Sequence, residues 1–247
     1  MFKKILCIAL CVVLMLSLCS CGYEYFDLNL ENEYTELAKA KGLVGTELNV
    51  YNWGEYISDG SEGCMDVNRE FERLTGIKVN YTTFESNETM YSQLKNGGVS
   101  YDIIIPSDYM IARLISEDML SKIDTASISN YKYIDQKYKG LFFDEQEQYT
   151  VPYNVGMVGI IYNSALIDEP EHSWGALWDE KYRNMSLNFN NPRDGFMTAQ
   201  KLLGFSVNST NKDEWNKACE KMKQGKGVLQ SYVMDEIYGK LETGEAA

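Results

Sequence analysis

The sequence lacks histidine in number and the usual catalytic constellations of enzymes. It holds a single histidine, His172, in a turn before an expected helix, where a solvated or capping role is favoured over a catalytic one. Signatures of nucleophilic, zinc-dependent, ATP-binding and dinucleotide-binding enzymes do not occur in it. Cys-x-x-Cys pairs are absent, and no cluster of histidine and cysteine is available for zinc or another transition metal. We therefore expect no catalytic residues, no metal site and no cofactor.

Positive charge is also scarce. The chain has 23 lysines and arginines against 36 acidic residues, and its net charge is −13. Proteins that bind nucleic acid are typically basic, so we expect no nucleic-acid partner. An acidic chain can attract a cationic ligand, although acidity also serves solubility alone. The charge therefore argues against anionic ligands more firmly than it selects a cationic one.

The amino terminus has the pattern of a cleaved export signal. Two lysines precede an apolar run over residues 5–18, which is too short to span a membrane comfortably. The run ends in Leu-Cys-Ser-Cys-Gly at residues 18–22, which resembles the lipobox of bacterial lipoproteins; a retained signal anchor is the weaker alternative. In lipoproteins the peptidase cuts before the last cysteine. We therefore expect loss of residues 1–20 and a lipid on Cys21 that anchors the chain to a membrane.

The mature chain is longer than one typical domain and alternates between strands and helices. Residues 21–44 have several glutamates and no clear period, and they predict a flexible tether. The expected strands are Leu48–Asn52, Ile77–Thr82 and Tyr101–Ile105. The expected helices cover residues 60–74, which Gly76 ends, residues 86–96, with Ser86 or Asn87 as the cap, and the segment after Ser107, where Met110 and Leu114 face inward. This alternation predicts a parallel, layered α/β lobe over residues 45–152, in which the third strand is buried on both faces.

A second α/β series follows in residues 153–247. Its expected strands are residues 157–162, 185–189 and 228–230, and its expected helices are residues 173–181, 194–203, 212–223 and 232–241. Two α/β lobes joined by extended segments predict a cleft that binds a small molecule. The final residues have the pattern of a helix end that leads into a further strand, so we expect the second lobe to be incomplete at the carboxyl terminus.

Aromatic and acidic side chains follow two of the predicted strands. Trp53, Glu55 and Tyr56 come after the first strand, and Ser107 and Tyr109 come after the third. Parallel strands end at the same edge of a sheet, where open α/β sheets bind their ligands. Aromatic faces attract cations, and carboxylates form strong hydrogen bonds with ammonium groups. These residues predict an amine site, although Trp53 taken alone is equally consistent with a core position.

The second lobe should supply an anion that faces this edge. The candidate segment is Asn-Asn-Pro-Arg-Asp at residues 190–194, between a predicted strand and a predicted helix. Asp194 lies in the first turn of that helix, where a carboxylate also complements the helix dipole. The ligand-binding role and the dipole role have about equal weight on the sequence alone.

Several segments, taken in order, resemble the spermidine/putrescine-binding proteins of bacterial ABC importers. They are Tyr-Asn-Trp-Gly-Glu-Tyr at 51–56, Phe-Glu-Arg-Leu-Thr-Gly-Ile-Lys-Val at 71–79, Phe-Glu-Ser-Asn-Glu-Thr-Met-Tyr at 84–91, Tyr-Asp-Ile-Ile-Ile-Pro-Ser at 101–107 and Val-Pro-Tyr at 151–153. The Glu-Ser-Asn-Glu-Thr-Met block is the most specific of them, and the similarity runs from about Leu48 to the last residue. The resemblance implies a two-lobed type II periplasmic-binding fold that closes on a polyamine.

The resemblance also implies roles for individual residues. The positions that match the two binding segments of the first lobe are Trp53, Glu55, Tyr56, Ser107 and Tyr109. Asp194 matches an acid that receives an amine, whereas Asn191 stands where better-known members have an aspartate, so this contact loses its charge. Val155 replaces a frequent aromatic residue. The family segment that supplies further tryptophans and an acid is not found before Ala247.

The implied function is capture of spermidine or putrescine and delivery to the permease subunits of an ABC importer. The expected location is extracytoplasmic, with a lipid anchor at the cell surface or in the periplasm. A related receptor for another cation or small metabolite stays open because of Asn191 and Val155. An exported enzyme on the same fold is the third alternative, and no recognisable nucleophile–base pair supports it.

Overall fold

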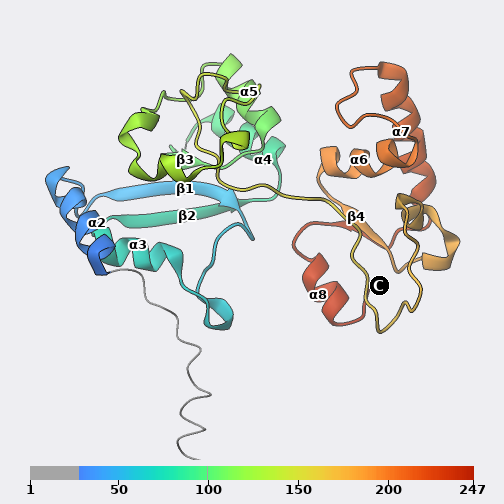
Figure 1. The fold of residues 1–247 in the computed structure, drawn as a ribbon. Coiled ribbons are helices and arrows are strands. Elements are labelled where there is room, and N and C mark those ends of the chain that lie inside the picture. The colour runs from blue at the N-terminus through green and yellow to red at the C-terminus, as the bar shows by residue number, and fades with distance from the viewer. Residues whose placement is uncertain (1–27, 99) are drawn as a thin grey trace, which may run out of the picture. The chain divides into compact units, whose positions relative to one another are not determined.

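The computed structural model describes residues 28–98 and 100–247 (Figure 1). Contacts divide the chain into two compact units, the first formed by the residues up to Asn49 with Ser58–Asn80, and the second by Val50–Ile57 with Tyr81–Ala247. The lobe boundaries predicted from the sequence, residues 45–152 and 153–247, stay predictions. The predicted signal peptide and the lipid site at Cys21 lie outside the described residues. In the part of the chain that the structure describes, no helix is long and apolar enough to cross a membrane.

The first unit contains a pair of packed helices, α2 (Leu28–Ala40) and α3 (Val67–Thr75). The Thr35 hydroxyl of α2 donates a hydrogen bond to the backbone oxygen of Leu74 in α3, at 2.6 Å. The sequence predicted a flexible tether over residues 21–44, whereas its described part is largely helical. The tertiary contact with α3 supplies stabilisation that the sequence pattern of α2 does not reveal, because most helical stability comes from packing.

Helix α3 begins and ends at specific capping residues. Gly76, with a φ of 70°, ends it in the left-handed conformation, as the sequence predicted. The helix begins at Val67 and not near residue 60, because the Asp66 carboxylate caps it by accepting a backbone N–H at 2.9 Å. Part of the preceding segment forms a 3-10 turn at Ser61–Gly63.

A three-stranded sheet has the order β2-β1-β3, formed by β1 (Glu47–Trp53), β2 (Lys78–Phe84) and β3 (Ile103–Ile104). Strands β1 and β3 run parallel, with Val50 opposite Ile103, as the α/β prediction requires. The side chain of Ile103 is 46% exposed, so the prediction that this strand is buried on both faces is wrong. Strand β3 lies at the edge of the described sheet, and it has a strand neighbour on one side alone.

The core beside this sheet is formed by strand residues and two helices, α4 (Asn87–Asn96) and α5 (Asp108–Ser116). Its buried members are Tyr51, Phe84, Met90, Met110 and Leu114. The Tyr51 ring meets the Phe84 ring edge-on at 4.9 Å between centroids, a favourable aromatic geometry. Met110 and Leu114 face inward as predicted, since residues four apart lie on one face of a helix.

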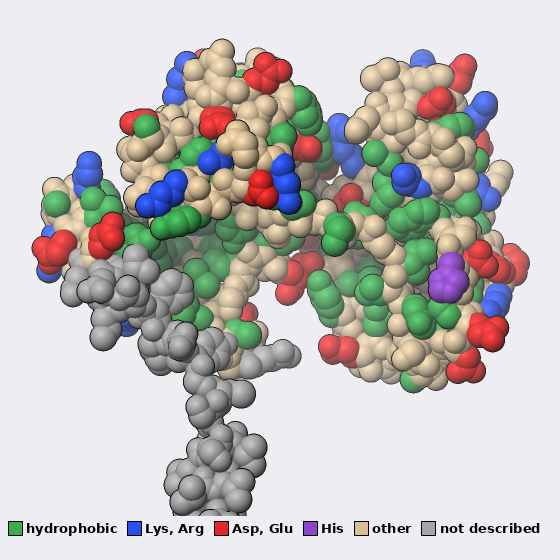
Figure 2. All heavy atoms as spheres, viewed as in Figure 1, with side chains coloured by type: hydrophobic (Ala, Val, Ile, Leu, Met, Phe, Trp, Pro, Cys, Tyr) green, Lys and Arg blue, Asp and Glu red, His purple; other side chains and the backbone are tan. Residues whose placement is uncertain are grey.

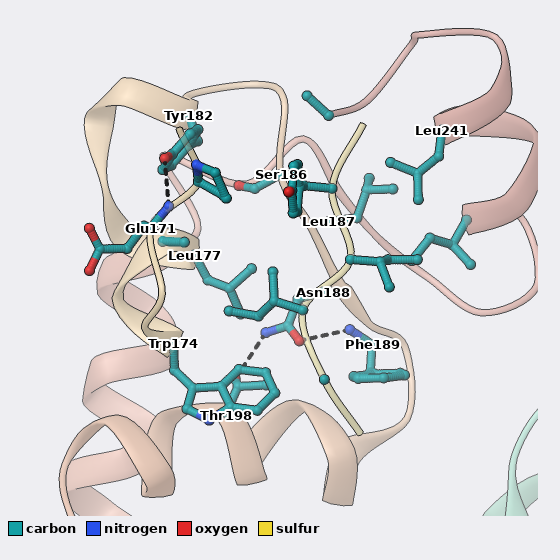
Figure 3. Close-up of a pocket in the computed structure, with 18 of the residues that line it drawn as sticks. Glu171, Trp174, Leu177, Tyr182, Ser186, Leu187, Asn188, Phe189, Thr198 and Leu241 are labelled. Atoms are coloured by element: carbon teal, nitrogen blue, oxygen red, sulfur yellow. Dashed lines mark hydrogen bonds between the residues drawn. The ribbon is translucent and has the colours of Figure 1, made fainter. Parts of the chain in front are cut away.

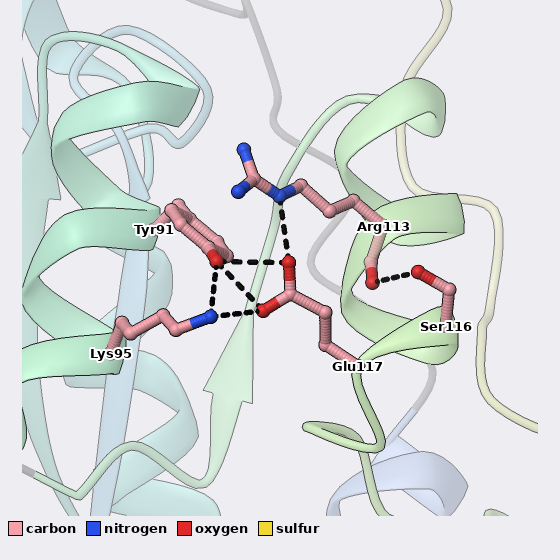
Figure 4. Close-up of polar contacts among 5 residues, drawn as sticks. All are labelled: Tyr91, Lys95, Arg113, Ser116 and Glu117. Carbon is pink, nitrogen blue, oxygen red and sulfur yellow. Dashed lines mark hydrogen bonds and ion pairs between the residues drawn. The ribbon is translucent and has the colours of Figure 1, made fainter.

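Polar contacts join α4 to the end of α5 (Figure 4). The Glu117 carboxylate accepts hydrogen bonds from Lys95 at 2.6 Å, from Tyr91 at 2.7 and 2.9 Å, and from Arg113 at 2.9 Å. The bonds from Lys95, Tyr91 and Arg113 lower the pKa of Glu117 to about 2. The Arg113 guanidinium also lies 3.8 Å from the centre of the Tyr91 ring. This cluster therefore fixes the helix pair that carries much of the core.

The chain between α5 and residue 187 is largely irregular. Short 3-10 turns form at Ser129–Tyr133 and Gln136–Tyr138, and residues 139–148 form neither a helix nor a strand. The buried Asp144 carboxylate accepts backbone N–H groups of Gln148, Tyr149 and Thr150 at 2.9–3.0 Å and so orders the end of this segment. The strand predicted over residues 157–162 is not formed.

That segment is apolar and extensively exposed. Met157 is 97% exposed, and Ile161 and Tyr162 are also exposed. No strand of the described structure pairs with these residues. A strand needs a hydrogen-bonding neighbour as well as a suitable sequence, so apolar character alone led to a wrong prediction.

The remaining elements are a two-stranded parallel sheet and three helices. They are β4 (Leu187–Phe189), β5 (Ser231–Val233), α6 (Pro192–Leu202), α7 (Lys212–Gly225) and α8 (Ile237–Glu242). Helices α6 and α7 follow their predictions closely. The helix predicted over residues 173–181 consists instead of 3-10 turns, Trp174–Trp178 and Glu180–Tyr182.

The end of the chain differs from the prediction by a shift of elements. The observed strand β5 begins three residues later than the strand predicted at 228–230. The helix predicted from residue 232 begins at Ile237. Tyr232 pairs with Asn188 of β4, which removes it from the helix. Pairing with β4, and not the local pattern, therefore sets both boundaries.

Candidate functional site

The end of β1 presents the first group of predicted site residues. The Asn52 side chain, which is buried, accepts the Trp53 backbone N–H at 2.8 Å and so fixes the point where the strand turns. The Trp53 ring is half-buried and lies 4.6 Å from the Phe84 ring and 6.0 Å from the Tyr56 ring. Trp53 therefore lies at the margin of the core and beside the surface residue Tyr56, and its ligand-binding role stays a prediction.

Tyr56 and Glu55 are the exposed members of this group. Tyr56 is 39% exposed, and its backbone oxygen accepts a hydrogen bond from the Tyr153 hydroxyl. Glu55 is exposed, and no hydrogen bond or ion pair to another described residue engages its carboxylate. Its carboxylate is therefore available to a partner from solution.

Ser107 and Tyr109, the second predicted group, are joined through Asn87 at the start of α4. The Asn87 amide nitrogen donates to the Ser107 hydroxyl at 3.0 Å and to the Tyr109 hydroxyl at 2.9 Å. The Tyr109 hydroxyl in turn donates to Glu88 at 3.1 Å. Burial, followed by the Glu88 charge, raises the pKa of Tyr109 to about 12, so this phenol stays neutral at physiological pH.

Two carboxylates lie near Tyr56, and only one of them was predicted. Burial raises the pKa of Tyr56, and the charges of Asp194 and Asp235 raise it further. A Cβ atom added to Gly54 would lie 2.5 Å from Oδ2 of Asp235, so the absence of a side chain at Gly54 leaves room for this acid. Burial raises the pKa of Asp194. Burial, and then the charge of the adjacent Glu236, raises the pKa of Asp235.

Asn191 has a structural task in this structure. It is the N-cap of α6, its side chain is buried, and its amide oxygen accepts the Arg193 backbone N–H at 3.1 Å. The Arg193 guanidinium lies 3.7 Å from the centre of the Tyr109 ring. The predicted ligand contact of Asn191 stays a prediction, and its oxygen is already used in capping.

The structure thus groups the predicted residues in pairs. Trp53 lies beside Tyr56, Ser107 and Tyr109 share Asn87, and Asp194 acts electrostatically on Tyr56. The sequence did not assign site roles to Asn87 or Asp235. Asn87 lies in the most specific of the resembling segments, which was a usable signal. Asp235 follows a strand whose position was predicted wrongly, so no signal identified it.

The chemistry of this arrangement suits a cation that also has an apolar part. Aromatic rings attract cations through their faces, and carboxylates hydrogen-bond to ammonium groups. Among the described residues, no group of three or more His, Cys, Asp or Glu side chains is placed to hold a metal ion. His172 is exposed at the surface (Figure 2), in agreement with the solvated role predicted for it.

An apolar pocket lies in another part of the second unit (Figure 3). Trp174, Leu177 and Phe189 contribute to its wall, and Asn188 inside it donates a hydrogen bond to Thr198 at 3.3 Å. The described residues of its wall include none of the predicted site residues. The pocket is therefore separate from the group of predicted site residues.

Comparisons with known proteins identify similar chains. Residues 67–247 match the family model described as "Bacterial extracellular solute-binding protein". The spermidine/putrescine-binding periplasmic protein of Salmonella typhimurium is 38% identical over 176 residues, which cover 70% of this chain and 49% of that protein. The spermidine/putrescine-binding periplasmic protein 1 of Haemophilus influenzae is 31% identical over 218 residues, which cover 85% of this chain and 59% of that protein.

A solved structure is also similar. The Listeria monocytogenes protein described as a spermidine/putrescine ABC transporter has a TM-score of 0.74 and 34% identity, with 81% of this chain and 61% of that chain covered. These findings confirm the predicted resemblance and the two-lobed type II periplasmic-binding fold class. The chain spans about half the length of the curated relatives it matches.

Proposed function

Because this chain belongs to the family of bacterial extracellular solute-binding proteins, we propose that it binds spermidine or putrescine and delivers the polyamine to an ABC importer. The names of its relatives support the ligand class. The description of the similar Listeria structure supports the transporter context. Delivery requires contact with the permease subunits of the importer, which are the protein partners in this proposal.

The observation that carries the proposal is the pair of carboxylates beside an aromatic residue. Asp194 and Asp235 both influence the titration of Tyr56, and the Tyr56 ring lies next to the Trp53 ring. A polyamine is a flexible apolar chain with ammonium groups at fixed spacing. Aromatic rings suit its methylene groups, and each carboxylate suits one ammonium group, at about 1.5–3 kcal/mol for each charged hydrogen bond.

The location follows from the family, and the mode of attachment is part of the proposal. Members of the family work outside the cytoplasm. We place a lipid on Cys21, which would anchor the domain to the membrane without spanning it. Growth with a radiolabelled fatty acid should label the wild-type protein and leave a Cys21→Ser variant unlabelled. Equal labelling of both proteins would contradict the assignment.

Calorimetric titration tests the ligand. Protein expressed from the complete open reading frame, purified free of polyamine, is titrated with putrescine, with spermidine and with propylamine as a single-charge control. We expect saturable heat with at least one polyamine and weaker binding of propylamine, which can satisfy one carboxylate only. No heat with either polyamine refutes the proposal.

Other outcomes of the same experiment select the alternatives. Saturable heat with a different small cation or metabolite, and none with polyamines, identifies a related solute receptor. The family is one of solute-binding proteins, and we propose that the ligand is released chemically unchanged. Chromatography of the ligand after prolonged incubation checks this point, because any new product indicates an enzyme.

A further inference from the structure

We propose that Asn87 is a positioning residue of the amine site, which orients the hydroxyl groups of Ser107 and Tyr109 so that their oxygens accept hydrogen bonds from an ammonium group. The inference rests on the proposed function, and it assigns a role to the segment Glu85–Met90, the most specific of the segments that resemble the family. Asn87 acts through its two neighbours and is not itself placed against the ligand.

The amide of Asn87 has one orientation that satisfies its neighbours. The Ser107 backbone N–H can only donate, and it lies 3.0 Å from the amide oxygen. The amide NH2 group therefore lies on the other side, where it donates to the hydroxyls of Ser107 and Tyr109. Asn87 is fully buried, so water cannot replace any of these three bonds.

This arrangement turns both hydroxyl oxygens into acceptors. A hydroxyl oxygen has two lone pairs, and one of them is used by the Asn87 amide. The Tyr109 proton is directed to Glu88, at 3.1 Å, and so away from the free lone pair. An ammonium group has donors only, so it needs acceptors that are held in place before it arrives.

Asn87 is the first residue of α4, but it does not cap that helix. The N-cap is Ser86, whose hydroxyl accepts the Thr89 N–H at 3.1 Å. A helix does not require a buried asparagine at this point, and helix stability alone does not explain the three bonds to residues 20 and 22 positions away. Orientation of Ser107 and Tyr109 explains all of them.

A double-mutant cycle separates positioning from a general structural role. The Kd for spermidine is measured by calorimetry for Asn87→Ala in the wild-type background and in a Ser107→Ala/Tyr109→Phe background. We expect Asn87→Ala to raise the Kd about 10-fold in the wild-type background. In the Ser107→Ala/Tyr109→Phe background the Kd should rise less than about 2-fold, because the oriented oxygens are already absent there. The matched control Asn96→Ala, at the exposed end of the same helix, should leave the Kd unchanged.

Equal increases in the Kd in the two backgrounds overturn the inference, because Asn87 then acts independently of the hydroxyls. Should Asn87→Ala unfold below the assay temperature, Asn87→Ser takes its place, since serine suits the first turn of a helix but cannot reach both oxygens. A wild-type protein that binds no polyamine refutes the proposed function itself, and this outcome is distinct from normal binding that Asn87→Ala leaves unaltered.

Discussion

Replacing Asp194 by asparagine separates its two possible roles. Asp194 lies in the first turn of α6, where a carboxylate complements the helix dipole by about 0.3–1 kcal/mol. Yet burial raises its pKa, so the charged form is less favourable in the folded chain than in the unfolded one. Such a group destabilises the fold at pH values above its folded pKa, and protonation relieves this cost as the pH falls. At pH 7, Asp194→Asn should therefore not lower the thermal midpoint of the ligand-free protein.

The same substitution should weaken polyamine binding strongly. Loss of one charged hydrogen bond costs about 1.5–3 kcal/mol, which corresponds to roughly a 10- to 150-fold increase in Kd. Calorimetry gives the Kd, and differential scanning calorimetry gives the midpoint. Asp213→Asn is the matched control, because Asp213 is exposed in the first turn of α7 and lies outside the proposed site. A lower midpoint for Asp194→Asn with an unchanged Kd would assign Asp194 to the helix dipole and refute the ligand role.

Three further predictions follow from single contacts. Gly225→Ala should lower the free energy of unfolding in urea by about 1–3 kcal/mol, because the added Cβ would lie 2.6 Å from the Trp178 indole nitrogen. The control Gly239→Ala has open space around it and should not lower the free energy of unfolding. Glu117→Gln should lower the thermal midpoint at pH 7 and have a smaller effect at pH 3. The pKa of Glu117 is lowered in the folded chain, so its charged form stabilises the fold above the unfolded pKa, and this stabilisation is lost as the pH falls toward 2. Asp235→Asn should raise the Kd for spermidine by roughly 10-fold or more without lowering the midpoint; equal affinity would remove Asp235 from the site.

Local signals in the sequence predicted the elements that depend on local contacts. Gly76 ends α3 as predicted, and Ser86 caps α4, one of the two caps, Ser86 or Asn87, that the sequence offered; a capping residue acts on its own first or last turn. The inward positions Met110 and Leu114 followed from helical spacing in the same way. These interactions join residues that are close in sequence, so a window of a few residues contains all the necessary information.

Elements that depend on a distant partner were predicted less well. Residues 157–162 have the composition of a strand, but the described structure offers them no paired neighbour. Tyr232 has the pattern of a helix, but its pairing with Asn188 of β4 makes it part of β5. Strand formation depends on which segments meet, and a sequence window does not record that choice.

The same distinction explains what was missed in the site. Aromatic residues after a strand are visible in the sequence, whereas Asn87 acts on residues 20 and 22 positions away. Asp235 acts on Tyr56, which lies in a distant part of the chain. A sequence can thus identify candidate side chains that follow a correctly predicted strand, but not side chains whose role depends on a partner far away in the chain.

Asn191 caps α6 and is also one of the predicted ligand-binding residues. Its amide oxygen already accepts the Arg193 N–H and caps α6, so it offers a ligand no charge and only its second oxygen lone pair. Asp235 supplies a second carboxylate near Tyr56, beside Gly54, which lacks a side chain. In the proposed site, Asp194 and Asp235 together would set the spacing between ammonium groups that binds best. A change in which polyamine is preferred, and not a general loss of affinity, is the expected result of the asparagine at position 191.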